Sequence, residues 1–196
     1  MSDETLKTEA LSCTRCGLAQ TRTQVVFGVG PVPCDLMLIG EAPGEQEDLK
    51  GEPFVGKAGQ LLDQILASAG FNRNENVYIA NTIKCRPPEN RNPLPTEMQA
   101  CQEWLERQIE LVQPKIIILC GSVAMKMAFP ESTDGITKQR GRWLQWKNRD
   151  AIVIFHPSYL LRNQSKAEGS PKWLTWQDVK EIRTAWDYYQ KISNVA

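Results

Sequence analysis

The stretch Asp35-Leu36-Met37-Leu38-Ile39-Gly40 decides the fold class of this chain, because it is apolar at four consecutive positions and runs into a glycine-rich turn. A strand that is apolar on both faces is typical of a parallel sheet with helices on both sides. Three later stretches have the same character, at residues 77–80, 115–120 and 151–155. Strands of this kind that alternate with helical segments predict an α/β protein, built as a three-layer α/β/α sandwich.

Helical patterns fill the segments between and after these strands. Residues 60–69 carry leucine and isoleucine on one face, and Gly70 is expected to end that helix. A long helix is expected to open at Thr96, with Gln99 completing a capping box three residues later. Residues 178–192 are expected to form a closing helix.

The composition is that of one soluble globular domain over residues 1–196, with 41% hydrophobic and 23% charged residues. No apolar run approaches the roughly 20 residues that a membrane helix needs. Residues 1–7 are polar and acidic, which does not resemble a secretory signal. Six cysteines without such a signal indicate a reducing compartment, so we expect a cytoplasmic protein that does not associate with membranes.

The charges of the chain balance, with 23 basic and 23 acidic residues. A zero net charge argues against a protein that coats nucleic acid by neutralising many phosphates. A local basic patch stays possible, at residues 138–142, at Lys147 with Arg149, or at Arg162 with Lys166. Each of these clusters, taken alone, is more simply interpreted as an ordinary solvated face.

The carboxyl ends of the expected strands carry unusual residues, and ligands of such sheets bind in the crevice outside these ends. The first strand runs into the turn at residues 40–44, which is either a plain connection or a backbone that approaches a ligand closely. The second strand ends at Asn81, whose planar amide could read a base edge or cap a turn. The fourth ends at His156, the only histidine of the chain. Phe54, on a loop bracketed by glycines, is either a core residue or a stacking platform.

The cysteines fall into two sets. Cys34 and Cys120 flank apolar strands and are interpreted as small core or loop residues. The other four could form a four-thiolate site only if the fold brings them together, and their spacing does not choose between zinc and an iron–sulfur cluster. These four are Cys13, Cys16, Cys85 and Cys101, the last of which lies on the inward stripe of the long helix.

Four sequence blocks together resemble a known family. They are GEAPGEQED from Gly40, GEPFVGKAGQLLD from Gly51, NTIKCRPPENRNPLPTE from Asn81, and HPSYLLR from His156. With the four cysteines, they make the chain similar to the family 4 uracil-DNA glycosylases, the iron–sulfur branch of that superfamily. The resemblance implies an α/β/α sandwich with a four-stranded parallel sheet. It also implies a [4Fe–4S] cluster on Cys13, Cys16, Cys85 and Cys101.

The resemblance implies a DNA repair enzyme. Such a glycosylase flips uracil out of DNA and hydrolyses its N-glycosidic bond, leaving an abasic site. The implied substrate is uracil-containing DNA, single- or double-stranded, and the implied active form is a monomer. The alternatives from other classes are a catalytically weak uracil- or DNA-binding module that recruits a replication partner, and a redox- or zinc-regulated binding protein.

The resemblance also assigns roles to individual residues. Phe54 would stack on the extruded base, and Asn81 would bond its Watson–Crick edge. His156 would donate a hydrogen bond to the departing uracil. Glu41 would position water or stabilise the cationic sugar, because Ala42 stands where the best-known branch of the superfamily has an aspartate. The complete implied uracil pocket comprises Gly40, Glu41, Ala42, Phe54, Asn81 and His156.

The segment after His156 is implied to contact DNA. In this interpretation, Leu160, Leu161 and Arg162 press against the duplex, fill the gap left by the flipped nucleotide and grip phosphate.

Overall fold

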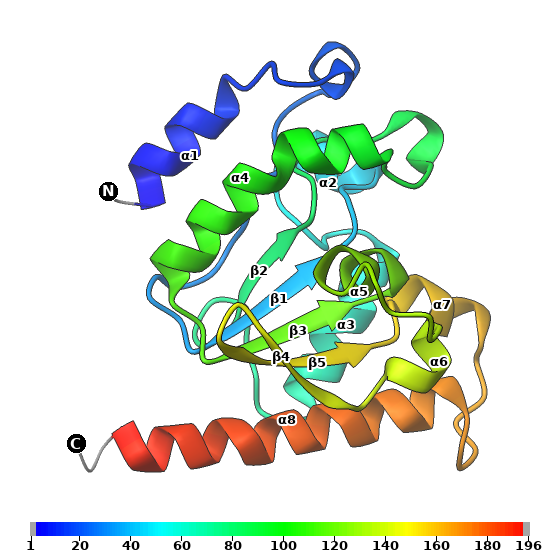
Figure 1. Ribbon diagram of the computed structural model, residues 1–196. Coiled ribbons are helices and arrows are strands. Elements are labelled where there is room, and N and C mark those ends of the chain that lie inside the picture. Colours follow the sequence, from blue (N-terminus) through cyan, green and yellow to red (C-terminus); the bar gives the residue numbers. More distant parts are fainter. Residues whose placement is uncertain (1–2, 194–196) are drawn as a thin grey trace.

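The computed structural model describes residues 3–193, and they are organised around one five-stranded sheet (Figure 1). The ends of the expected domain, residues 1–2 and 194–196, lie outside the described residues. The strand order is β2-β1-β3-β5-β4. The strands are β1 (Leu36–Gly40), β2 (Tyr78–Asn81), β3 (Ile116–Cys120), β4 (Trp143–Trp146) and β5 (Arg149–Ile154).

The four expected strands are confirmed as a parallel set, and a fifth strand was not expected. β1, β2, β3 and β5 pair in parallel, whereas β4 pairs antiparallel with β5 at the edge of the sheet. The turn between β4 and β5 is made by Lys147 and Asn148, which have φ values of 50° and 59°. A two-residue hairpin turn of type I′ requires positive φ at both of its central residues. The sheet therefore has five strands rather than four, with the parallel core intact.

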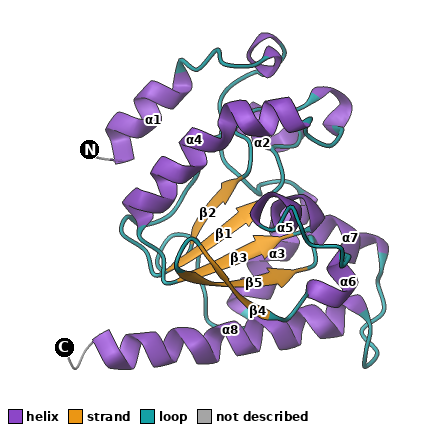
Figure 2. Ribbon diagram, viewed as in Figure 1, coloured by secondary structure: helices purple, strands orange, loops and turns teal. Residues whose placement is uncertain are grey.

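Helices cover both faces of the sheet, which confirms the three-layer sandwich (Figure 2). On one face, α3 (Lys57–Ala67) and α8 (Pro171–Ser193) pack on side chains such as Leu38. On the other face, α4 (Pro95–Val112) and α5 (Ser122–Ala128) pack on neighbours such as Met37. Adjacent residues of one strand thus belong to different cores, which explains why the strands are apolar throughout.

Two helix starts differ from the sequence expectation. The expected Thr96–Gln99 capping box is wrong: α4 begins at Pro95, and the Glu97 carboxylate accepts a hydrogen bond from the Leu94 N–H at 2.8 Å. Proline is well suited to the first helical position because its missing N–H has no partner there. α8 begins at Pro171, seven residues before the expected start at residue 178, again with proline at its first position.

The remaining helices are short, from three to nine residues. α1 packs against α4 (Figure 1), and Leu6 and Ala10 of α1 form a hydrophobic cluster with Trp104 of α4. Within residues 3–193, none of the helices combines the length and the apolar character needed to traverse a bilayer. These helices are α1 (Asp3–Leu11), η1 (Gly17–Gln20), α2 (Glu45–Lys50), η2 (Pro88–Asn90), α6 (Ile136–Gln139) and α7 (Pro157–Arg162).

A buried ion pair connects the segment before β4 to α8. Arg140 donates from Nε to Asp178 Oδ2 at 3.0 Å and from Nη2 to Oδ1, and the Asp178 side chain is 1% exposed. Gly141 follows with φ 72°, and a Cβ there would lie 2.7 Å from Asp178 Oδ1. The basic stretch 138–142 is therefore not a free cationic patch, since Lys138 and Arg142 also pair with Asp134.

We predict that Arg140→Met lowers the free energy of unfolding by about 3–5 kcal/mol, because it leaves the Asp178 carboxylate buried without its partner. Lys138→Met is the control, since its exposed pair with Asp134 should contribute only about 0–1 kcal/mol. Denaturant unfolding of both variants measures the difference. Equal losses in the two variants would contradict the structural role assigned to the buried pair.

Candidate active site and thiol cluster

The carboxyl ends of the parallel strands open into a cavity of about 730 Å³. Glu41 enters it from the turn after β1, Asn81 from the end of β2, and His156 from the residue pair that follows β5. Phe54 lines it from the loop between α2 and α3. The structure thus brings together residues that are far apart in the sequence, and Ala42 lines the same cavity.

Gly40 lies directly beneath this group. A Cβ at Gly40 would lie 2.5 Å from the Phe54 ring and would also overlap Asn81 Oδ1. Real Cβ atoms do not approach so closely, so a side chain at this position would displace Phe54 or Asn81. The absence of a side chain at the end of β1 is therefore a steric requirement of the pocket.

Asn81 presents a buried acceptor that has no partner within the described part of the chain. The residue is 1% exposed, and Oδ1 accepts no hydrogen bond. Its backbone carbonyl accepts from Lys84 Nζ at 2.7 Å, which holds the residue at the end of β2. An unsatisfied buried acceptor costs about 1–3 kcal/mol, a cost that a ligand N–H would remove.

His156 is a neutral imidazole with a defined proton position. Burial lowers the pKa of His156 to about 4, and the nearby Arg162 charge acts in the same direction. Nδ1 accepts from the Ser158 N–H at 3.2 Å and lies 2.8 Å from Ser158 Oγ. With Nδ1 accepting, the hydrogen-bond network assigns the ring proton to Nε2. The ring centroid lies 5.6 Å from that of Phe54.

Glu41 places a half-buried carboxyl in the cavity, and burial raises the pKa of Glu41 above its ordinary value. The backbone of the turn is anchored, since the Glu41 carbonyl accepts from Thr82 Oγ1 at 2.5 Å and from the Ile83 N–H at 3.4 Å. The second carboxylate of the cavity, Glu47, is used differently. It accepts from the backbone N–H groups of Gly44, Val55 and Gly56.

Several residues that line the cavity were not predicted from the sequence. Gly121 and Ser122 follow β3, so the rule that ligands bind beyond the strand ends could have found them. Asn90 and Arg91 come from the proline-rich loop before α4, and Thr137 comes from α6. No sequence signal identified these last residues, because their approach depends on how the loops fold back over the sheet.

The expected DNA-contacting segment forms α7, and the structure corrects one of its residues. Leu160 is 0% exposed and packs in the core shared with α3, so the expectation that it contacts DNA is wrong for this conformation. Leu161 is partly buried against the same core. Tyr159, which is 38% exposed, and Arg162 line the cavity instead. The helical period turns these two side chains outward while Leu160 faces inward.

The four candidate cysteines line one hollow between the N-terminal segment, the stretch after β2, and α4. Trp104 Nε1 donates to Cys13 Sγ at 3.2 Å, Arg22 Nη1 to Cys85 Sγ at 3.3 Å, and the Lys84 N–H to Cys101 Sγ at 3.3 Å. The remaining cysteines, Cys34 and Cys120, are buried in the two sheet cores, as expected. The four sulfurs of the hollow are Cys13, Cys16, Cys85 and Cys101.

Four thiol groups around one hollow are the type of ligand that iron–sulfur clusters use. In the described residues, no group of three or more His, Cys, Asp or Glu side chains is arranged to bind one metal ion. Burial raises the pKa of Cys85, and that of Cys101 to about 11. A bound cation would favour the ionised form of these thiols, because a metal ion deprotonates a coordinating thiol.

Comparison with known proteins gives a consistent result. The sequence profile of the Uracil DNA glycosylase superfamily matches residues 27–180. The Type-4 uracil-DNA glycosylase of Thermotoga maritima is 46% identical over 154 residues, covering 78% of this chain and 80% of the relative. That of Archaeoglobus fulgidus is 44% identical, covering 78% and 80%, and that of Sulfurisphaera tokodaii is 43% identical, covering 80% and 72%. The chain therefore belongs to the uracil-DNA glycosylase superfamily and, within it, to the type-4 family.

Proposed function

We propose that this protein removes uracil from DNA by hydrolysing the bond between uracil N1 and the sugar C1′. The observation that carries the proposal is the convergence of an unpaired amide acceptor, a neutral imidazole donor and an aromatic ring in one cavity at the strand ends. The base must leave the stack to reach this cavity, at a cost of a few kcal/mol. The products are free uracil and an abasic site.

Asn81 reads the base. Its Oδ1 accepts from uracil N3–H, and its Nδ2 donates to a ring carbonyl, while Phe54 stacks on the ring face. Cytosine presents an acceptor at N3 and a donor at the neighbouring position. It would leave the buried amide unpaired, and mismatches of this kind support strong rejection.

His156 stabilises the departing base. As the C1′–N1 bond breaks, its electron pair passes to the uracil ring, and negative charge develops on the ring oxygens. The Nε2–H of a neutral imidazole donates to this charge, an effect worth roughly 3–4 kcal/mol in comparable oxyanion sites. The low pKa of His156 supports this form of the ring at neutral pH.

Glu41 acts on the sugar side of the reaction. Of the two carboxylates that line the cavity, Glu47 is occupied by backbone N–H groups, whereas no described hydrogen bond uses the Glu41 carboxylate. Ionised Glu41 orients the water that adds to C1′ and favours the positive charge that develops there. Ala42 carries no carboxylate that could share this task.

DNA is gripped outside the uracil pocket by α7 and its surroundings. Arg162 supplies a positive charge to a phosphate, and the exposed Tyr159 ring packs against the DNA beside the gap. Leu161 contributes from the same helix. The protein acts as a monomeric single domain on uracil in single- or double-stranded DNA.

The four cysteines of the hollow bind a [4Fe–4S] cluster with a structural role. When bound, the cluster supplies four metal–sulfur bonds that cross-link segments far apart in the sequence. N–H groups of Trp104, Arg22 and Lys84 donate hydrogen bonds to three of the sulfurs. Such donors are expected around thiolates that bind a metal. The hollow is separate from the uracil cavity, and no cysteine lines both.

His156→Ala should fold and bind uracil-containing DNA, but lose about 10²–10³ in the single-turnover cleavage rate. Because the parental imidazole is already neutral, the parental rate should not fall with rising pH between about pH 6 and about pH 8. Arg162→Ala is the contrasting variant and should weaken binding more than chemistry. Parental cleavage by His156→Ala would exclude the proposed donor role.

Asn81→Ala should cost roughly 2–4 kcal/mol of transition-state stabilisation, because it removes the base-reading groups and the orientation they impose. Single-turnover cleavage of a uracil oligonucleotide at saturating enzyme measures this loss. Asn90→Ala, at the exposed rim of the same cavity, is the control and should retain most of the rate. A parental rate for Asn81→Ala would mean that Asn81 serves only the turn.

Cys85→Ala should lose iron and visible colour and should melt at a lower temperature, because it removes one of the cross-links of the N-terminal segment. Cys34→Ala, equally buried but outside the hollow, should keep its iron. Iron content, visible absorption and thermal melting are measured on purified protein. A Cys85→Ala protein without iron but with parental melting would contradict the structural role.

A further inference from the structure

The loop that carries Phe54 has a strained backbone. Phe54 lies between α2 and α3 with φ 54°, in the left-handed region, and the residue is 5% exposed. A non-glycine residue in this conformation costs of order 1–3 kcal/mol and persists only where its surroundings impose it. The ring is nevertheless the one that faces Gly40 and His156 in the uracil cavity.

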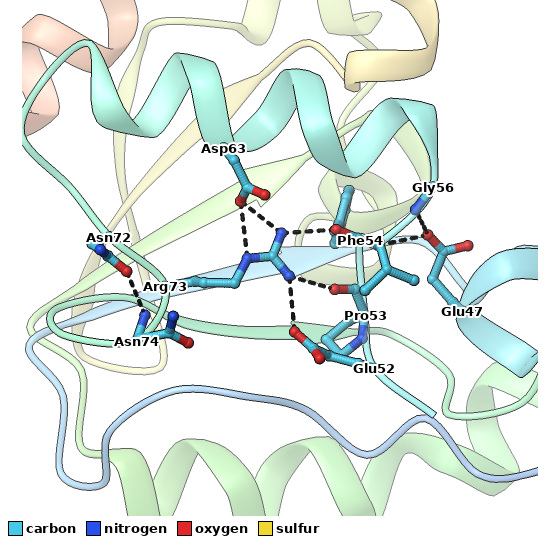
Figure 3. A network of polar contacts seen from close by, with 10 residues as sticks. Glu47, Glu52, Pro53, Phe54, Gly56, Asp63, Asn72, Arg73 and Asn74 are labelled. Atoms are coloured by element: carbon cyan, nitrogen blue, oxygen red, sulfur yellow. Dashed lines mark hydrogen bonds and ion pairs between the residues drawn. The ribbon is translucent and has the colours of Figure 1, made fainter. Parts of the chain in front are cut away.

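Arg73, in the connection between α3 and β2, holds the carbonyl side of this loop (Figure 3). Nη1 donates to the Pro53 carbonyl at 2.9 Å, and Nη2 donates to the Phe54 carbonyl at 2.8 Å. The other donors bind carboxylates: Nε and Nη2 reach Asp63 Oδ1 at 2.9 and 2.7 Å, and Nη1 reaches Glu52 at 3.4 Å. All five N–H groups of the guanidinium are thereby used. The side chain is only 11% exposed.

Glu47 holds the amide side of the same loop (Figure 3). Its Oε1 accepts from the Val55 N–H at 2.9 Å and from the Gly56 N–H at 2.8 Å. Its Oε2 accepts from the Gly44 N–H at 3.1 Å, in the turn after β1. The peptide groups around Phe54 are therefore held by a cation on their carbonyls and by an anion on their N–H groups.

The first turns of α3 leave the loop no room to move toward the helix. A Cβ at Gly59 would overlap the Phe54 carbonyl, so the carbonyl that Arg73 binds lies directly against the helix backbone. Asp63, the main carboxylate partner of Arg73, comes from one turn further along α3. The guanidinium thus joins the Phe54 backbone to the helix that supports it.

We propose that Arg73 is a positioning residue of the uracil pocket, which sets the place and tilt of the Phe54 ring without touching the substrate. Arg73 itself does not line the cavity, so its action must pass through Phe54. The inference rests on the proposed stacking role of Phe54. The planar fork of arginine bridges two successive carbonyls and a carboxylate, which a single ammonium group cannot do, so lysine is a poor replacement.

The direct test observes Phe54 itself. The protein is labelled with 4-fluorophenylalanine, which gives one ¹⁹F signal for each of its five phenylalanines, and Phe54→Leu assigns the Phe54 signal. Arg73→Met should shift or broaden that signal while the other four stay in place. Arg183→Met is the matched control, because Arg183 also binds two backbone carbonyls, those of Ala69 and Gly70, at the far end of α3. It should leave the Phe54 signal unchanged.

The functional test is a double-mutant cycle on single-turnover cleavage. Arg73→Met should lower the rate by about 10- to 100-fold, the scale expected when a contact group is misplaced. In a Phe54→Ala background, the same change should cost less than about 3-fold, because residues that act through one another are not additive. Arg183→Met should keep the parental rate in both backgrounds. Arg73→Lys, which retains the charge, should give an intermediate loss and covers the case in which Arg73→Met does not fold.

The outcomes separate this inference from the proposed function. An unmoved Phe54 signal in Arg73→Met, or equal rate losses in both backgrounds, would overturn the positioning role while uracil excision stands. A parental protein that does not cleave uracil would refute the proposed function, whereas the ¹⁹F result would still decide whether Arg73 sets Phe54. Parental cleavage by Phe54→Ala would remove the stacking role, and the inference with it.

Discussion

The parallel pairing of β1 with β2 is the constraint on which the site depends. Its register sets Gly40 opposite Asn81, so the turn after β1 and the Asn81 amide reach the same point of the cavity through backbone pairing. β5 reaches the same edge through β3, and it brings His156 with it. Because the sheet is buried on both faces, a shift of register would exchange the two cores, and the cavity geometry is as strongly specified as the fold.

Hydrogen bonds around the cavity mostly engage backbone atoms, or the side-chain atom that points away from the cavity. The side-chain atoms that could contact a substrate are left free in the described part of the chain. Thr82 and Ile83 bind the Glu41 carbonyl rather than its carboxylate, and Ser158 binds Nδ1 of His156 rather than Nε2. Asn81 is held by its carbonyl, while Oδ1 stays unpaired. The groups that would meet a substrate are therefore oriented before it arrives. Such preorganisation costs stability in the free protein and favours the transition state.

The sequence predicted the parts that depend on burial and strand ends, and missed those that depend on long-range contacts. The parallel strands were found because burial on both faces produces uninterrupted apolar runs. The edge strand Trp143–Trp146 is half exposed and gave no such signal. Leu160 was misplaced because HPSYLLR was interpreted as a contact segment, although Pro157 at a first helical position indicates a helix with an inward face. Arg73 gave no signal, because its partners include backbone carbonyls 19 and 20 positions earlier in the chain.

The five residues from Asn81 to Cys85 connect the end of β2 to the thiol hollow. The Lys84 N–H donates to Cys101 Sγ, and the Lys84 ammonium donates to the Asn81 carbonyl; the residue is 1% exposed. A buried ammonium is tolerated only where its partners are well placed. This requirement restricts the path that the backbone can follow after β2. Cys85 then lines the same hollow as the cysteines of the N-terminal segment and of α4. Residues that contribute no side chain to the cavity thus help to hold Asn81 in place at its edge.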